Sequence, residues 1–263
     1  MTNYLFPALT SSYPVYPINE EIEDGTIRTN SEAGRVVTRS RDNRFGRKTW
    51  KISYEYISTI DKETIEYFIQ NVQCGARSFY WGNQSVDINN PIVAESFNGT
   101  VVSSVVPGWT IYSAGSPGTL VYQNNGIVSG FCGQFWTTAT SWAFYKTLTL
   151  TVGKQYAFGF YIKTGDLVNK IFYCGILDPN LLVWLKQISG QQTSSWTYYA
   201  DVWNATQTSV HLWMSVNPEV GKYVYFDKVS VIESPKEVRF VELPKFSYIL
   251  NGYWNCEFAI KEV

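Results

Sequence analysis

The sequence predicts a mainly all-β protein with one short helix, and three observations lead to this fold class. Aromatic residues make up 17% of the 263 residues and charged residues only 16%, which is less charge than the roughly 25% of an average globular chain. Short segments of alternating apolar and polar residues recur along most of the chain. Turn-forming Gly, Pro and Asn separate these segments, whereas helical periodicity is confined to one segment.

The positions of the arginines divide the chain into two regions. None occurs between Arg77 and Arg239, and Pro91 and Pro235 lie at the two edges of that stretch. A composition that changes and then changes back is typical of an inserted domain, whose host ends lie close together. We therefore expect one discontinuous domain of residues 1–88 plus 235–263, and an inserted domain of residues 89–234.

The discontinuous domain is expected to be a small β-sandwich or open barrel with one helix. Apolar residues alternate with polar ones over residues 49–56, which predicts a half-buried strand. Residues 34–38 and 79–83 are predicted to form further strands because they are rich in β-branched or aromatic residues.

A helix and a hairpin complete the elements predicted for this domain. Ser58 and Asp61 have the spacing of a helix-capping pair, and apolar residues of 65–72 follow at helical spacing on one face. Near the C-terminus, Asn251 and Gly252 form a pair that is favoured in tight β-hairpin turns.

The inserted domain is predicted to be a β-sandwich of the jelly-roll type. Turn signals separate seven segments with strand patterns, and so many short strands in about 145 residues favour this architecture. The predicted strands cover residues 147–152, 156–162, 170–177, 181–187, 195–203, 208–216 and 223–232.

Composition excludes several classes of function. The net charge of -1 argues against a protein that binds duplex DNA through phosphate neutralisation. The single histidine, His211, disfavours a histidine-based metal site. It also has no evident nucleophile or orienting carboxylate with which to form a catalytic triad. No apolar stretch approaches the roughly 18–20 residues of a membrane span. We therefore expect a protein that is not an enzyme and does not insert into a membrane.

The predicted discontinuous domain resembles phage tail-tip proteins of the distal-tail and minor-tail type. It combines a Gly- and Arg-rich entry, a strand of alternating aromatic residues, a helix, an F-x-W turn and a closing aromatic hairpin. These motifs lie in INEEIEDGTIRTNSEAGRVVTRSRDNRFGRKTWKISYEYIS, DKETIEYFIQNVQCGARSFYWGN and VRFVELPKFSYILNGYWNCEFAIKEV. The resemblance implies a structural ring in the virion, often hexameric, that joins the tail tube to the tip and its tail hub proteins.

The predicted inserted domain resembles the jelly-roll carbohydrate-binding modules that are appended to glycoside hydrolases. The segments that carry this resemblance are ESFNGTVVSSVVPGWTIYSAG, TVGKQYAFGFYIKTG, SWTYYADVW and YVYFDKVSVIES. The structural calcium common in these modules would have Glu95 and Asp227 as candidate side-chain ligands. Asn98 stands where such modules usually have an acidic residue after the phenylalanine. We expect no cofactor apart from a possible structural calcium.

Strand alternation identifies candidate sugar-binding residues, since sugars stack on flat aromatic faces. In three of the predicted strands an aromatic residue or His211 points away from the more aliphatic face. We expect these side chains to share one exposed surface, with a further tryptophan nearby, although packing in the core or against a neighbouring subunit is the alternative. The candidates are Trp136, Tyr173, Trp184, His211 and Trp213.

Charged residues near the N-terminus are candidates for contacts between subunits. A basic run and an acidic segment in one chain can complete each other head-to-tail around a closed ring. A solvated loop is the alternative for the basic run. The candidate interface residues are Glu20, Glu21, Arg39, Arg41, Arg44 and Arg47.

Together these patterns predict a virion protein at the tail tip, made in the host cytoplasm. It would form a homo-oligomeric ring, contact tail tube and tail hub proteins, and bind host cell-surface polysaccharide through the inserted domain. The alternatives are an insertion that serves only as a spacer or docking domain for other tail proteins, and, less favoured, a glycan-degrading enzyme. No sequence-specific nucleic-acid partner is expected.

Overall fold

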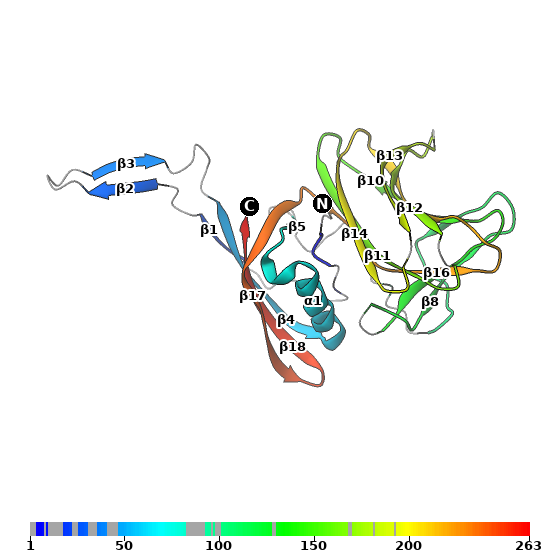
Figure 1. Cartoon of the computed structure of the whole chain (residues 1–263), viewed down its shortest axis with the longest axis horizontal. Helices are drawn as coiled ribbons and strands as arrows, with labels where there is room; N and C mark the ends of the chain where they lie inside the picture. The colour runs from blue at the N-terminus through cyan, green and yellow to red at the C-terminus, as the bar shows by residue number, and fades with distance from the viewer. Residues whose placement is uncertain are drawn as a thin grey trace.

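The computed structural model describes most of the chain. It covers residues 4–7, 9, 18–22, 26–30, 36–40, 47–82, 93–95, 97, 101–127, 130–167, 170–180, 182–191 and 193–263, with the backbone alone for 26–30, 36–40 and 93–95. The predicted mainly all-β fold class is confirmed, because three antiparallel sheets, a two-stranded ribbon and one α-helix account for the described elements (Figure 1). No helix of the described part is long and apolar enough to cross a membrane.

One five-stranded sheet, here called the basal sheet, is built from both ends of the chain. Its strand order is β1-β4-β18-β17-β5. The strand predicted at residues 49–56 is present, and its alternation holds for the buried Trp50, Ile52 and Tyr54 but ends at Tyr56, which is exposed in the left-handed region at φ 58. The strands are β1 (Asn19–Ile22), β4 (Lys48–Ser58), β5 (Phe79–Trp81), β17 (Lys236–Leu250) and β18 (Tyr253–Glu262).

A single helix and a tight turn complete the basal sheet. Helix α1 (Thr59–Asn71) begins after Ser58, whose hydroxyl accepts a hydrogen bond from the backbone N–H of Asp61 at 3.1 Å. Ile65 and Phe68 of the helix are fully buried against the sheet, and a 3₁₀ turn (Gln73–Gly75) follows. Asn251 (φ 49) and Gly252 (φ 81) close the β17–β18 hairpin in the left-handed region, as the sequence pair predicted.

A two-stranded ribbon projects from the basal sheet. Strands β2 (Thr26–Asn30) and β3 (Val36–Ser40) pair with each other and with no other described strand. Figure 1 shows the ribbon standing away from the rest of the molecule. An isolated two-stranded hairpin is marginally stable in water, so such a ribbon needs a further surface to pack against.

The remaining strands form a sandwich of two sheets. The inner sheet has the order β14-β11-β16-β9-β8 with β6 added on β16, and the outer sheet has the order β13-β12-β15-β10-β7. Aromatic side chains such as Phe144, Phe158 and Phe226 fill the core between them. The inner strands are β6 (Val93–Glu95), β8 (Thr119–Gln123), β9 (Cys132–Trp136), β11 (Gln155–Thr164), β14 (Thr197–Asn204) and β16 (Tyr223–Glu233). The outer strands are β7 (Thr110–Tyr112), β10 (Ala143–Thr149), β12 (Ile171–Leu177), β13 (Trp184–Gln191) and β15 (Ser209–Val216).

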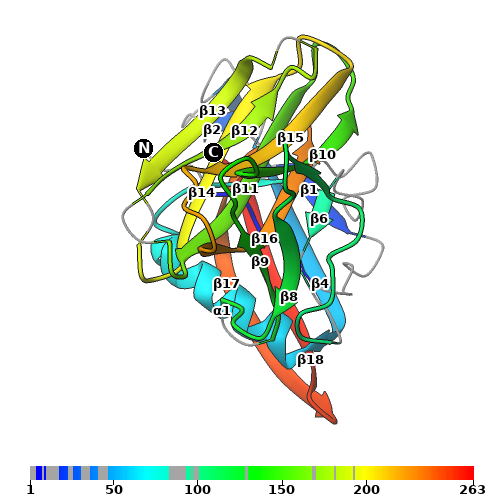
Figure 2. The same cartoon turned by 90° about the vertical axis from the view of Figure 1, so that its right-hand side faces the viewer.

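The inner sheet lies between the outer sheet and the basal sheet. Its second face carries Ala157, Tyr161 and Tyr198 into the same hydrophobic core as Trp50 and Phe68. Figure 2, which turns the sandwich toward the viewer, shows the basal strands behind it. The face of the outer sheet that is not in the sandwich core therefore points away from the basal sheet.

The N-terminal segment helps to join these layers. The backbone N–H of Leu5 donates to the hydroxyl of Tyr198 at 3.0 Å, and that hydroxyl donates to the carbonyl oxygen of Leu5, also at 3.0 Å. The next residue, Phe6, packs its ring against Phe68 and Trp81 with centroids 5.4 and 4.7 Å apart. The segment is therefore bonded to the inner sheet and packed on the basal core.

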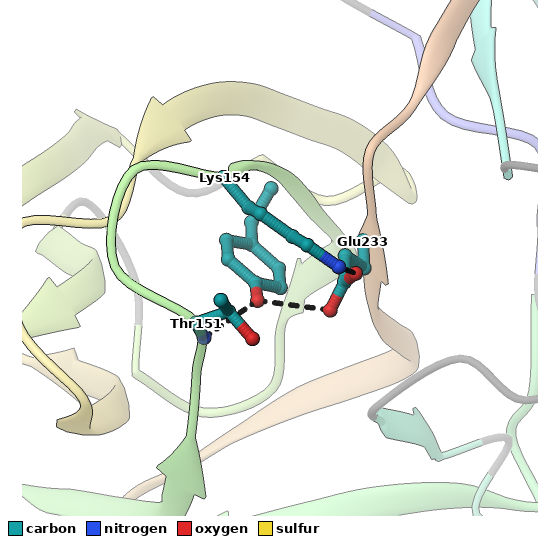
Figure 3. Close-up of polar contacts among 4 residues, drawn as sticks. Thr151, Lys154 and Glu233 are labelled. Atoms are coloured by element: carbon teal, nitrogen blue, oxygen red, sulfur yellow. Dashed lines mark hydrogen bonds and ion pairs between the residues drawn. The ribbon is translucent and has the colours of Figure 1, made fainter. Parts of the chain in front are cut away.

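A polar cluster holds the chain where the sandwich ends and β17 begins. Glu233, at the end of β16, accepts hydrogen bonds from the ammonium of Lys154 and from the hydroxyl of Tyr156, the latter at 3.0 Å. That hydroxyl in turn accepts from the backbone N–H of Thr151 at 2.9 Å (Figure 3). The hydrogen bond from Lys154 is the main cause that lowers the pKa of Glu233.

Candidate functional site

The exposed face of the outer sheet contains a cleft of about 520 Å³. Three aromatic residues from β12, β13 and β15 lie in it, namely Tyr173, Trp184 and Trp213. The remaining lining residues are Tyr112, Ala139, Trp142, Leu177, Leu182, Gln187, Ser215, Val216, Asn217 and Pro218. The cleft is therefore mostly apolar and aromatic, which is typical of small-molecule and sugar sites.

The cleft exists because small residues occupy the middle of this face. Gly175 of β12 pairs with Trp213 on one side and Gln187 on the other, so the row between these two side chains is empty. In the next row of the same face, Ser215 pairs with Ala143. Gly175 has φ 149, and a Cβ atom there would lie 2.2 Å from the carbonyl oxygen of Lys186, so the backbone requires glycine at this position.

Packed aromatic rings form one wall of the cleft. The ring of Trp213 is 3% exposed and lies 5.0 Å from that of Tyr112 and 5.9 Å from that of Trp142. Tyr145 stacks on it from the other side, with centroids 5.3 Å apart and planes 12° apart. These contacts fix the orientation of the wall before any ligand arrives.

A bulge and a tight turn place Trp184 at the rim. Leu177 pairs with Trp184 while Ile176 pairs with Lys186, so one extra residue of β13 bulges out between them. The preceding turn is held by the side chain of Asp178, which accepts the backbone N–H of Asn180 at 2.8 Å. Leu182, in the left-handed region at φ 53 and 53% exposed, follows at the edge of the cleft.

His211 lies on the same face as the cleft but does not line it. Its ring is 4.2 Å from that of Tyr145, and its Nδ1 lies 3.2 Å from the hydroxyl of Thr147. Burial is the main cause that lowers the pKa of His211, which favours the neutral imidazole. His211 therefore lies beside Tyr145 and Trp213 and extends the aromatic surface along β15.

The structure thus brings together three of the five candidate sugar-binding residues, Tyr173, Trp184 and Trp213, with His211 beside them. Trp136 is a correction, because it lies on β9 of the inner sheet. Its ring packs on Tyr223 with centroids 4.6 Å apart, and its Nε1 donates to Gln134 at 3.1 Å. Trp136 was expected only to lie near the other candidates, since no strand was predicted around it.

The cleft also contains two aromatic residues that were not predicted. Tyr112 lies on β7, which is only three residues long, and Trp142 lies in the loop before β10. Neither has an alternating pattern around it, so periodicity could not identify them. The combination of a tryptophan with small residues just before a strand was the only available signal.

The possible structural calcium stays a prediction, because only one of its two candidate ligands, Asp227, has a described side chain. One carboxylate oxygen of the buried Asp227 accepts the backbone N–H of Ile127 at 3.0 Å, and the other accepts that of Lys228 at 2.7 Å. The ammonium of Lys228 is buried and has no hydrogen-bond partner in the described part of the chain. The backbone of Glu95 pairs with Val229, while its side chain lies outside the description.

Two of the candidate interface residues form ion pairs within the chain. Glu20 lies 2.7 Å from the ammonium of Lys48 and accepts the indole N–H of Trp50 at 2.9 Å, and both contacts lower its pKa. Glu21 lies 3.1 Å from Lys51. Arg47 is exposed, the backbone of Arg39 lies in β3, and its side chain, together with Arg41 and Arg44, lies outside the described part.

Comparison with known proteins gives structural neighbours but no family. No family model and no curated protein matches the sequence. The xylan-binding domain CBM22-1 of Paenibacillus barcinonensis Xyn10C is 13% identical, with a TM-score of 0.41 over 55% of this chain and 94% of that domain. Arabinose-bound MgGH51 α-L-arabinofuranosidase is 15% identical, with a TM-score of 0.42 over 53% of this chain. The enzymatically active domain of bacteriophage CBA120 tailspike protein 4 is 16% identical, with a TM-score of 0.39 over 50%.

Two of these matches also cover only a small part of the neighbouring protein. This chain covers 26% of the arabinofuranosidase and 21% of the tailspike protein. At these levels of similarity the neighbours define no ligand for this chain.

Proposed function

We propose that this protein is a structural component of a bacteriophage tail tip whose sandwich binds a glycan on the host surface. The aromatic cleft of the outer sheet carries the binding part of the proposal. Trp184, which is half-buried at the rim, offers an apolar ring face to the C–H face of a sugar, and amide and hydroxyl groups at the same cleft can bond to the sugar hydroxyls. A cleft with few polar groups placed among aromatic walls is the usual design of such sites.

The layer order supports a role in adhesion. The inner sheet is occupied on one face by the sandwich core and on the other by the basal core. The outer sheet, which carries the cleft, therefore lies on the side of the inner sheet away from the basal sheet, and the ribbon extends from the basal part (Figure 1). A protein that attaches to a particle through its basal part would present this cleft outward.

The ribbon supports assembly into a homo-oligomeric ring, which the resemblance to tail proteins predicts to be a hexamer. Strands β2 and β3 pair only with each other among the described strands, and such a ribbon needs a further surface to be stable. A neighbouring copy in a ring supplies one. Glu20 and Glu21 are paired within the chain, whereas Arg47 is exposed and can contact a neighbouring copy.

Glycan binding is tested with Trp184→Ala in the full-length chain. Removing about 80 Å² of ring contact, under half of what a buried tryptophan covers, at about 25 cal/mol per Å² removes about 2 kcal/mol. This predicts binding about 30-fold weaker to whichever host cell-wall polysaccharide retains the wild-type protein. Trp136→Ala is the matched control, because Trp136 is a half-buried tryptophan outside the cleft.

The alternatives predict different results. A spacer or docking domain for other tail proteins predicts that no host polysaccharide retains the wild-type protein, and this result would refute glycan binding. A glycan-degrading enzyme predicts the release of reducing sugar from the bound polymer, whereas we expect none. The ring is tested by the mass of the purified protein in solution, where a species that stays monomeric at high concentration contradicts it.

A further inference from the structure

The charge of the cleft restricts the ligand, an inference that rests on the glycan binding proposed above. None of the side chains that line it carries a formal charge at neutral pH. The neighbouring Lys186 turns its ammonium to Asp201 of the inner sheet, 2.9 Å away. A carboxylate or phosphate placed in this cleft would lose hydration without meeting an opposite charge, which is unfavourable.

Two amide side chains provide hydrogen bonds at the cleft. Gln187 and Asn217 are both exposed, and neither side chain bonds to another group in the described part of the chain. A primary amide offers two donors and an acceptor in one plane, which suits neighbouring hydroxyls of a sugar ring. By contrast, the hydroxyl of Ser215 is already used, since it donates to the carbonyl oxygen of Tyr173.

The separation of the two amides sets the size of the ligand. Gln187 and Trp213 pair with the same residue, Gly175, so they lie at one level on strands two apart. Asn217 follows Trp213 by four residues. At about 3.3 Å per residue and about 4.8 Å between strands, Gln187 and Asn217 lie about 13 Å apart along the strands and about 10 Å across them. A single sugar ring is too small to reach both.

We propose that the cleft binds a chain of uncharged sugar units lying obliquely across β13, β12 and β15. The chain stacks on Trp184, and it donates and accepts hydrogen bonds at Gln187 near one end and at Asn217 near the other. These two amides are the specificity-determining residues of the site. Uronate and phosphate polymers are excluded because nothing in the cleft balances their charge.

The inference is tested by affinity electrophoresis of the full-length protein through two sets of polymers. Arabinoxylan, galactomannan and mixed-linkage glucan are uncharged, whereas polygalacturonate and alginate are uronate polymers. The wild-type protein is expected to be retarded by at least one uncharged polymer and by neither uronate. Oligosaccharides of that polymer are expected to compete more strongly as they lengthen, and its monosaccharide is not expected to compete.

Two variants test the amides. Gln187→Ala and Asn217→Ala are each expected to weaken binding of the retained polymer about 5- to 10-fold, as for one lost hydrogen bond. Gln191→Ala, an exposed glutamine on the same strand outside the cleft, is the control and should bind as the wild type does.

The outcomes separate this inference from the proposed function. Binding that is lost in Trp184→Ala but unchanged in both amide variants overturns the inference and leaves glycan binding intact. The inference is likewise overturned, with glycan binding intact, if uronates retard the protein as much as uncharged polymers do. It is also overturned if the monosaccharide competes as strongly as its oligomers. If no uncharged polymer retards the wild-type protein, the inference fails, whereas the proposed glycan binding fails only if host cell-wall polysaccharide also does not retain it.

Discussion

The hydroxyl of Tyr198 is predicted to be a main polar link between the N-terminal segment and the sandwich. It both accepts from the backbone N–H of Leu5 and donates to its carbonyl oxygen, each at 3.0 Å. Leu5 and Tyr198 are 0% and 7% exposed. Tyr198→Phe would therefore leave a donor and an acceptor buried without partners.

The expected loss of stability follows from these two groups. A buried polar group without a partner costs about 1–3 kcal/mol, which gives about 2–6 kcal/mol for both. We expect about 3 kcal/mol, because the segment can shift to let water reach one of them. The assay is urea unfolding followed by tryptophan fluorescence, since Trp50 and Trp81 lie in the core on which this segment packs.

Tyr199→Phe is the matched control for this prediction. Tyr199 is the next residue on β14, and its ring packs on Phe160 and Phe172. Its hydroxyl makes no hydrogen bond within the described part of the chain, so the change should stay within about 0.5 kcal/mol of the wild type. Equal stability of the two variants would refute the bridging role of Tyr198.

Three further predictions concern the cleft, the polar cluster and calcium. Gly175→Ala forces a Cβ atom against the carbonyl oxygen of Lys186, so it should destabilise the protein by about 2 kcal/mol or more and weaken glycan binding, measured by thermal unfolding and affinity electrophoresis. The pKa of Glu233 is lower in the folded than in the unfolded chain, where it is about 4.5. The ionised carboxylate therefore stabilises the fold above that pH, and this stabilisation is lost as the pH falls through the folded pKa. Glu233→Gln should therefore flatten the decline of stability as the pH falls below about 4.5, and an unchanged slope would contradict this. Finally, because both oxygens of Asp227 already accept backbone N–H groups, millimolar calcium or EDTA should leave the melting temperature unchanged, and a calcium-dependent rise of several degrees would show a site.

The periodicity of the sequence predicted local structure well. The strand at 49–56, the helix after Ser58 and the turn at Asn251 and Gly252 are all present, because each depends on residues within a few positions of one another. Strand ends were less accurate. β10 begins at Ala143 rather than at residue 147, because its first residues are buried in succession instead of alternating.

Only part of the candidate cleft could be predicted, because local patterns fix the face of a strand but not its neighbours in the sheet. Tyr173, Trp184 and Trp213 were identified because alternation determines the face of a strand on which a side chain lies. Trp136 was expected near them without a strand assignment, and it lies on the other sheet because strand pairing depends on residues distant in sequence. The empty position at Gly175 depends on pairing with two strands distant in sequence, so the hollow itself could not be predicted from local patterns.

The inner sheet packs in a hydrophobic core on each of its two faces, and this affects how several copies could bind one surface. With one face in the sandwich core and the other in the basal core, the sandwich is mounted directly rather than on a flexible tether. In any assembly of copies the clefts would therefore be held at fixed angles and spacings. Binding through several clefts at once would raise the overall affinity strongly for a surface whose glycans match that spacing. It would raise the affinity little for other surfaces, because the effective concentration falls steeply when geometry forbids a second contact. The density and order of sugars on a surface, and not only their chemistry, would then determine which surface is bound.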